Sequence, residues 1–213
     1  MKRLAPVLLL MLAFPSAVLA DTSDFTTVNG QLTGSNLGLH LDASLIAING
    51  FTGFNLGTII FSIGKLKAGT GTLIGGALFE STNSSFTITL TNVAGGFPGG
   101  IIFVGTFTSD INWTPVPGQA GFYTLEGSIS GTLKTQGHII KTTSVAGFTS
   151  QVYFVTFGHN DTQLNLSTVG SGDTFLTPSV PEPGTLSLLG TGFAVLPAVF
   201  RRRRQSLTGQ SER

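Results

Sequence analysis

The sequence predicts an all-β body, either an antiparallel β-sandwich or an irregular barrel. Three observations support this fold class: apolar and polar residues alternate along several segments, short β-branched and aromatic runs lie between them, and turn-forming residues separate them. A parallel β-helix has less support, because the recurring glycine-rich pieces are too irregular for a repeat. We also expect a cleaved N-terminal signal helix and a single C-terminal hydrophobic helix outside this body.

Alternation is clearest from Tyr123 to Lys134, where apolar residues or glycine take the odd positions and polar residues take the even ones. The same pattern runs through residues 37–45, with Leu37 on the apolar side, and through residues 86–91. Successive side chains of a strand point to opposite faces, so a period of two indicates a half-buried strand. These segments are therefore predicted to have one buried and one solvent-facing side.

Residues 58–63, 101–104 and 152–157 are short runs that are apolar at nearly every position. Such runs are typical of central strands that are covered on both faces, and we expect that arrangement here. Breakers separate the predicted strands, at Asn49-Gly50, Gly69-Thr70-Gly71, Gly95 to Gly100 and Pro115 to Gly118. The body is predicted to span residues 21–178, and no segment before Thr185 has the pattern of an amphipathic helix.

The formal net charge of +1 conceals an acidic body with basic ends. Between Asp21 and Pro178 there are four lysines and eight acidic residues, so the charge of the body is 4 − 8 = −4. Without a basic patch, nucleic-acid binding has no electrostatic support. The chain has no cysteine, which excludes disulfides, thiolate metal sites and cysteine nucleophiles. The body must therefore be stabilised by its hydrophobic core.

Residues 1–20 have the pattern of a secretory signal peptide. Basic residues at Lys2 and Arg3 precede an apolar run from Leu4 to Phe14, and Val18-Leu19-Ala20 fits a signal peptidase site. Cleavage between Ala20 and Asp21 would make Asp21 the first mature residue. An uncleaved membrane anchor is the alternative, but the apolar run is short for a hydrocarbon layer about 30 Å thick.

The C-terminal region has three consecutive parts. Its motif is Val180-Pro181-Glu182-Pro183-Gly184, the following residues 185–200 are uncharged, and the basic cluster is Arg201, Arg202, Arg203 and Arg204. Sixteen residues in a helix reach about 24 Å, which is marginal for a full span. The arginines would stay in the cytoplasm and leave the body outside. Physical chemistry alone therefore indicates a stop-transfer segment or a transient membrane tether.

This order of parts resembles the PEP-CTERM sorting domain, at residues 179–204, followed by a short polar tail at 205–213. The resemblance implies a Gram-negative host that makes exopolysaccharide, and a protease-like membrane enzyme, the exosortase, as partner. Pro181, Glu182 and Pro183 would be its recognition element. It also implies export through the inner membrane, transient residence there, and a final place on the cell surface or in the extracellular matrix. The tail after Arg204 is a departure, since such domains usually end soon after the arginines. The alternative is a simple anchor behind a proline-rich linker.

No catalytic or metal-binding residue is predicted in the body. His40, His138 and His159 lack metal-ligand spacing, and His159-Asn160-Asp161 is predicted to form a turn rather than a calcium loop. The serines of Gly127-Ser128-Ile129-Ser130-Gly131 fall on a predicted strand, not on a nucleophile elbow. Glu80 and Glu126 have no sequence context that marks a glycosidase pair.

Two further features have a structural and a ligand-binding interpretation. Residues 69–75 are glycine-rich but lack the lysine of a phosphate loop, so they are predicted to connect two strands. Trp113, the sole tryptophan, could stack on a sugar or fill the end of the core, and the core position is the stronger prediction. We therefore expect a non-enzymatic surface or matrix protein without a cofactor, in which exopolysaccharide is a candidate partner. The alternative is a carbohydrate-binding or carbohydrate-cleaving β-sandwich protein, with Trp113 exposed near Tyr123 or with two acids in one cleft.

Overall fold

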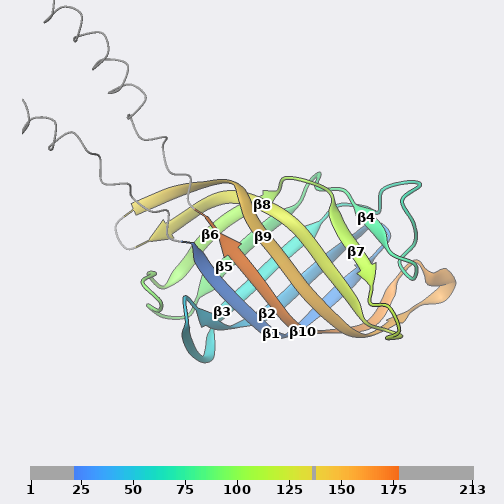
Figure 1. Ribbon diagram of the computed structural model, residues 1–213, viewed down its shortest axis with the longest axis horizontal. Helices are drawn as coiled ribbons and strands as arrows, with labels where there is room; N and C mark the ends of the chain where they lie inside the picture. The colour runs from blue at the N-terminus through green and yellow to red at the C-terminus, as the bar shows by residue number, and fades with distance from the viewer. Residues whose placement is uncertain (1–21, 136–137, 178–213) are drawn as a thin grey trace, which may run out of the picture. The chain divides into compact units, whose positions relative to one another are not determined.

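The computed structural model of the chain describes residues 22–135 and 138–177, and Figure 1 shows these as coloured ribbon. The predicted signal helix and C-terminal hydrophobic helix lie outside the described residues. Within the described ranges, no helix is long and apolar enough to cross a membrane.

Ten strands and one short 3-10 helix make up the described structure. The first five strands are β1 (Ser23–Ser35), β2 (Gly38–Ile48), β3 (Phe51–Ile63), β4 (Ala77–Phe79) and β5 (Ser85–Leu90). The others are β6 (Gly100–Phe107), β7 (Ile111–Pro115), β8 (Tyr123–Thr135), β9 (His138–Phe157) and β10 (Leu164–Leu176), with η1 (His159–Asp161) between the last two. The all-β prediction is confirmed for this part of the chain.

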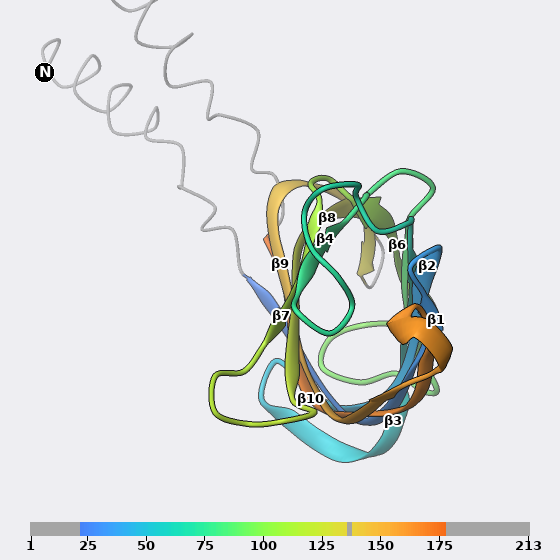
Figure 2. The same ribbon diagram turned by 90° about the vertical axis from the view of Figure 1, so that its right-hand side faces the viewer.

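The strands form one antiparallel sheet that closes on itself. Their order is β4-β7-β8-β6-β5-β3-β2-β1-β10-β9, and β8 also pairs with β9. On its other edge β8 pairs first with β7 and then with β6, so β7 extends the ring where β6 ends. Figures 1 and 2 show the curved sheet from the side and from one end. Of the two predicted architectures, the closed single sheet corresponds to the irregular barrel rather than to a sandwich of two sheets.

The core fills the inside of the closed sheet and follows the predicted alternation. Phe86, Ile88 and Leu90 of β5 all point inward and are buried, with polar residues between them. The rings of four core phenylalanines, Phe61, Phe86, Phe107 and Phe148, pack together with centroids 4.9 to 6.1 Å apart. Most of these rings meet edge to face, the arrangement that aromatic quadrupoles favour.

The prediction that the apolar runs are covered on both faces is wrong. Ile60, Ile101, Val104 and Phe154 all have exposed side chains. The physical reason is the closure of the sheet. Its inner face encloses the core, and in the described part of the chain its outer face is exposed to solvent. Leu37, expected on a buried face, instead lies in the β1–β2 turn and is 79% exposed.

The first and last strands of the body place its two termini at the same end of the closed sheet. Ser23 of β1 pairs with Leu176 of β10, so the chain enters and leaves the body side by side. The β2–β3 hairpin turns at the same end, because Asn49 N donates to Asp24 O at 2.9 Å. Asn49 and Gly50 have φ of 49° and 77°, as a two-residue hairpin turn requires, so the predicted breaker is confirmed there.

Candidate functional site

The residues predicted to direct sorting lie outside the described part of the chain. This holds for the motif Val180 to Gly184, for the cluster Arg201 to Arg204, and for Ala20 and Asp21 at the predicted signal cleavage site. The structure therefore informs the function of the body.

Trp113 of β7 belongs to the core. Its side chain is 1% exposed, and its Nε1 donates to the carbonyl of Leu73 at 2.7 Å. The indole stacks on Tyr123 with a centroid separation of 4.4 Å, and the Tyr123 hydroxyl donates to the carbonyl of Ile74 at 2.9 Å. Burial raises the pKa of Tyr123. The core position predicted for Trp113 is confirmed, and the alternative of an exposed sugar platform at this residue is wrong.

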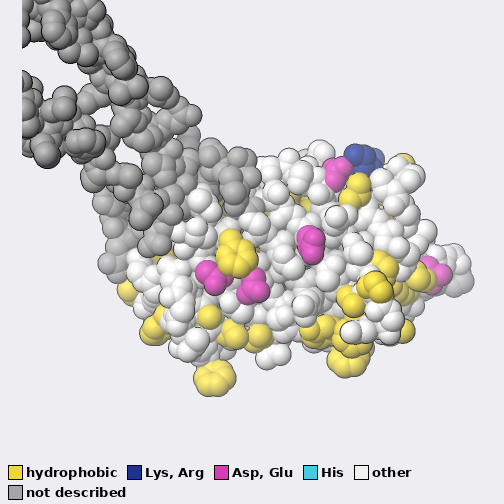
Figure 3. Space-filling model, viewed as in Figure 1, with side chains coloured by type: hydrophobic (Ala, Val, Ile, Leu, Met, Phe, Trp, Pro, Cys, Tyr) yellow, Lys and Arg dark blue, Asp and Glu magenta, His cyan; other side chains and the backbone are white. Residues whose placement is uncertain are grey.

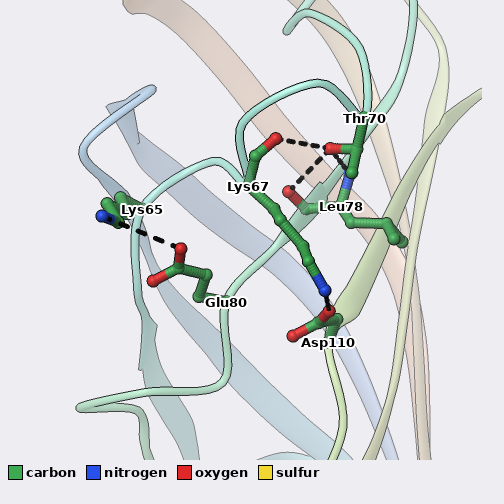
Figure 4. Close-up of polar contacts among 6 residues, drawn as sticks. All are labelled: Lys65, Lys67, Thr70, Leu78, Glu80 and Asp110. Carbon is green, nitrogen blue, oxygen red and sulfur yellow. Dashed lines mark hydrogen bonds and ion pairs between the residues drawn. The ribbon is translucent and has the colours of Figure 1, made fainter.

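The glycine-rich segment at residues 69–75 is a turn-containing strand connection, as predicted. Figure 4 shows the contacts that hold it: the Thr70 hydroxyl donates to Lys67 O at 2.7 Å and accepts from Leu78 N at 3.1 Å. Lys67 Nζ lies 2.6 Å from Asp110 Oδ2, and this hydrogen bond raises the pKa of Lys67. These groups satisfy one another, so the segment has a structural role in joining β3 to β4.

The candidate chemical residues are distributed over the body. His40 is exposed on β2, where its Nδ1 lies 2.9 Å from Ser62 Oγ, and the segment from Gly127 to Gly131 is part of β8. His138 begins β9, and the His159–Asp161 segment forms η1, the predicted turn. Among the residues that the structure describes, no three His, Asp or Glu side chains gather in a way that could hold a metal ion.

The acidic pair considered from the sequence is not the pair that shares a hollow. Glu80 lies 3.8 Å from Lys65 Nζ, while Glu126 and Asp110 both line an open hollow of about 350 Å³. A separate acid, Asp24, has a pKa raised by burial and, to a lesser degree, by the charge of Asp173. One Asp24 oxygen is buried without a hydrogen-bond partner among the described groups. The hollow brings two acids together, and one of them, Asp110, is held by Lys67 at 2.6 Å.

The feature that the sequence did not reveal is a partly exposed cluster of three aromatic rings, Phe122, Tyr153 and Phe154, which we call the aromatic cluster. Tyr123 of β8 pairs with Val152 of β9 and both point inward. Phe122, just before β8, and Tyr153, next along β9, therefore point outward and are half-buried. The ring centroid of Phe122 is 4.9 Å from that of Tyr153 and 6.1 Å from that of Phe154. Phe154 is 64% exposed.

A β-bulge turns two consecutive aromatic side chains outward. Between the pairs Thr168–Tyr153 and Leu166–Thr156, β9 advances three residues while β10 advances two. The extra residue is Phe154, whose φ is 54°, and the buried side chain of Val155 then restores the inward direction. A positive φ is rare for a bulky residue and costs about 1–3 kcal/mol. Bulges that re-aim side chains often occur at functional sites, so this strained position is the strongest local sign of function in the body.

The surroundings of the aromatic cluster combine apolar and polar groups. Gly170 makes room for Tyr153, since a Cβ there would lie 1.7 Å from Tyr153 Cε2. The Tyr153 hydroxyl contacts Gln151 Oε1 at 2.5 Å, and an open hollow of about 520 Å³, lined by residues 115–123, adjoins Phe122. Figure 3 shows one face of the body, on which hydrophobic side chains are scattered and charged side chains are few. Flat rings beside hydroxyl and amide groups can stack on the apolar face of a ligand and bond its polar edge.

Comparison with known proteins adds information on the C-terminal segment alone. No curated protein matches the chain. No solved structure matches it either. A family model described as the PEP-CTERM protein-sorting motif matches residues 179–204, the range expected from the resemblance. The chain therefore carries a PEP-CTERM sorting motif in residues 179–204, which implies export and processing at the membrane by an exosortase.

Proposed function

We propose that this chain is an exported, non-enzymatic protein of the surface or extracellular matrix of a Gram-negative bacterium, anchored transiently in the inner membrane and released by an exosortase. The observation that carries the proposal is the sorting motif at residues 179–204. The signal-peptide pattern of residues 1–20 supports it, because both ends then direct the body across the same membrane.

The residues of the motif suit recognition by a protease. Proline fixes φ and disfavours helix in the residue before it, so Pro181 and Pro183 favour an extended strip around Glu182. An extended strip is the form in which proteases bind their substrates. The uncharged residues 185–200 would hold this strip at the membrane, and Arg201 to Arg204 would stop translocation, at roughly 2.5–3.5 kcal/mol for each arginine in the bilayer.

The non-enzymatic role of the body is supported by where its polar groups lie. Glu80 forms an ion pair with Lys65 at 3.8 Å. Asp110, one of the two acids that line the hollow, forms an ion pair with Lys67 at 2.6 Å. The segment from Gly127 to Gly131 lies within a strand, whereas a serine nucleophile needs a sharp turn into a helix. A rigid closed sheet with a mostly uncharged polar surface is suited to persist outside the cell, where it would contact matrix polymers.

The proposal is tested by changing Pro181, Glu182 and Pro183 to alanine together, in the native host. The variant should be exported and inserted but not processed, so mass spectrometry should find chain that retains Arg201 to Arg204. The matched control is Pro178→Ala, which removes a proline just outside the motif and should be processed like the parent. Normal processing of the triple variant would show that the motif acts as a linker.

Binding of carbohydrate is a second candidate function, favoured by the aromatic cluster. An exposed Phe154 held in a strained conformation beside Tyr153 offers rings for stacking, with Gln151 as a polar neighbour. The net charge of −4 between Asp21 and Pro178 favours neutral glycans over acidic ones.

This second function is tested by a screen of neutral and acidic glycans with the purified body. Loss of one stacking ring should weaken binding of a neutral glycan by about tenfold in Phe154→Ser. Leu37→Ser is the control, since Leu37 is also an exposed apolar residue, at 79% against 64% for Phe154, and lies in the β1–β2 turn. Equal binding by both variants would exclude the aromatic cluster as the binding site.

A further inference from the structure

We propose that the end of the closed sheet next to the chain termini is a membrane-contact surface, which rests on the lipid headgroup region while residues 185–200 tether the chain. This inference rests on the proposed function, since it requires the C-terminal segment to enter a bilayer. It adds a surface of the body that neither the sorting motif nor the aromatic cluster includes.

The surface consists of four exposed apolar side chains, which we call the apolar rim: Phe51, Phe54, Val93 and Ile101. Their exposed fractions are 52%, 97%, 66% and 56%. A nearly fully exposed phenylalanine is unfavourable in water, and burial of one such side chain changes an equilibrium constant by roughly ten- to a hundredfold. The rim therefore has a strong tendency to leave water.

The apolar rim lies at the end where the body is joined to its termini. Phe51 follows the β2–β3 turn, and Asn49 in that turn accepts from Asp24 N at 2.9 Å through its side chain. Asn49 Nδ2 donates to Gly95 O at 3.4 Å, which ties the β5–β6 loop with Val93 to the same end. Ile101 stands at the start of β6, and Figure 1 shows the β2–β3 hairpin at the end where β1 begins.

Phe54 is held outward by an arch in β3. From Ala47–Thr52 to Leu45–Gly57, β3 advances five residues while β2 advances two, so three residues are extra. The arch is anchored, because Leu56 O accepts from Thr91 N at 2.9 Å and Leu56 packs against the core. A bulge of this kind re-aims side chains, and here it fixes Phe54 in solvent rather than in the core.

The length of the connection to the tether brings this end to the bilayer. From Leu176 to Thr185 there are nine steps, which extend at most about 30 Å. The twelve steps along β10 from Leu164 to Leu176 span about 40 Å. This connection keeps the rim end within about 30 Å of the bilayer, whereas the opposite end can lie about 40 Å farther away. The rim end is therefore the one that the tether presents to the lipid.

The charges near the apolar rim suit a neutral lipid surface. Residues 48–57 and 91–101, which carry the rim, contain no charged residue. The charged residues of the paired strands at this end are Asp24 and Asp173 on β1 and β10, and Lys134 and Lys141 on β8 and β9, two of each sign. The charge of residues 21–178 is −4. An anionic surface would repel such a body, whereas zwitterionic phosphatidylcholine would accept an uncharged apolar rim.

The absence of cysteine from the sequence allows a site-specific test in the full-length chain. Thr52→Cys places an environment-sensitive fluorophore between Phe51 and Phe54, and Ala68→Cys places it in the β3–β4 connection at the other end. The chain is reconstituted through its C-terminal segment into phosphatidylcholine vesicles that contain brominated lipid as quencher. Quenching at position 52 should exceed that at position 68 at least twofold.

Variants assign the effect to the rim. In the Thr52→Cys chain, Phe54→Ser with Val93→Ser should remove the excess quenching, and Leu37→Ser should retain it, because Leu37 is exposed at the opposite end. Both changed side chains are exposed, so the fold is not at risk. Full quenching in the double variant, or equal quenching at positions 52 and 68 in the parent, would overturn the proposal.

Two other outcomes separate this proposal from the proposed function. A chain that fails to float with vesicles would refute both the tether and the membrane contact. A chain that floats and is processed in cells, but shows no excess quenching, would refute the membrane contact alone. If the fluorescence at position 52 depended on protein concentration in the absence of lipid, the apolar rim would contact a second copy of the chain. That result would overturn the proposed membrane contact.

Discussion

Replacing Trp113 by phenylalanine should lower the free energy of unfolding by about 3 kcal/mol. The indole is 1% exposed and stacks on Tyr123, and its Nε1 bonds the carbonyl of Leu73, itself a buried residue. Phenylalanine keeps a ring for the stack but has no donor, so the carbonyl loses its partner at a cost of about 1–3 kcal/mol. The smaller ring also leaves a cavity that adds about 1 kcal/mol.

Tyr123→Phe is the matched control for this prediction. It keeps the stack on Trp113 and removes only the hydroxyl that donates to Ile74 O at 2.9 Å, so the expected loss is about 1 kcal/mol. Urea unfolding of residues 21–178, followed by far-UV circular dichroism, measures both variants without relying on the tryptophan signal. If Trp113→Phe cost no more than the control, the indole would not secure the β3–β4 connection, and our account of this part of the core would be wrong.

Three further predictions concern the body. Residues 21–178 should fold alone with a β-type circular dichroism spectrum, because the closed sheet contains its own core; a mainly helical spectrum would contradict this. Asp24→Asn should stabilise the protein slightly at pH 7, because the raised pKa of Asp24 means that its ionised form is disfavoured in the folded state. The gain should vanish as the pH falls through that pKa, and an unchanged difference at pH 3 in thermal unfolding would refute the assignment. Gly57→Ala should lower the free energy of unfolding by several kcal/mol, since the new Cβ would lie 1.9 Å from Thr89 O. Gly147→Ala is the control and should change the unfolding midpoint little, because no atom lies within 4 Å of a Cβ at that position.

Alternation allowed the strands to be predicted because it depends only on which side of a strand meets water. The segment from Tyr123 to Lys134 falls within β8, and Phe86, Ile88 and Leu90 are all buried as expected. The prediction of covering on both faces failed for the apolar runs, since a run of isoleucine and phenylalanine is compatible with either a buried or a half-exposed strand. Ile60 and Phe61 are adjacent in sequence, yet one is exposed and the other buried.

The aromatic cluster could not have been predicted in the same way. Residues 152–157 have the composition of a covered strand, and nothing in them signals the positive φ of Phe154. That conformation arises from the register between β9 and β10, two strands whose pairing is set by contacts along the whole sheet. The single tryptophan was the more conspicuous candidate for ligand binding in the sequence, and the structure places it in the hydrophobic core.

The sequence by itself determined the sorting signal of this protein and the all-β character of its body. A sorting motif is read as a linear string, and a period of two in hydrophobicity is local, so neither needs a tertiary fold to be recognised. Only the tertiary structure decided that the sheet closes on itself, that Trp113 lies inside, and that Phe54 and Phe154 lie outside. These outcomes depend on pairing between strands far apart in the chain, such as β1 with β10, and on bulges that shift one strand against its neighbour. Such pairings depend on the sum of many long-range contacts, and no single segment of the sequence contains them.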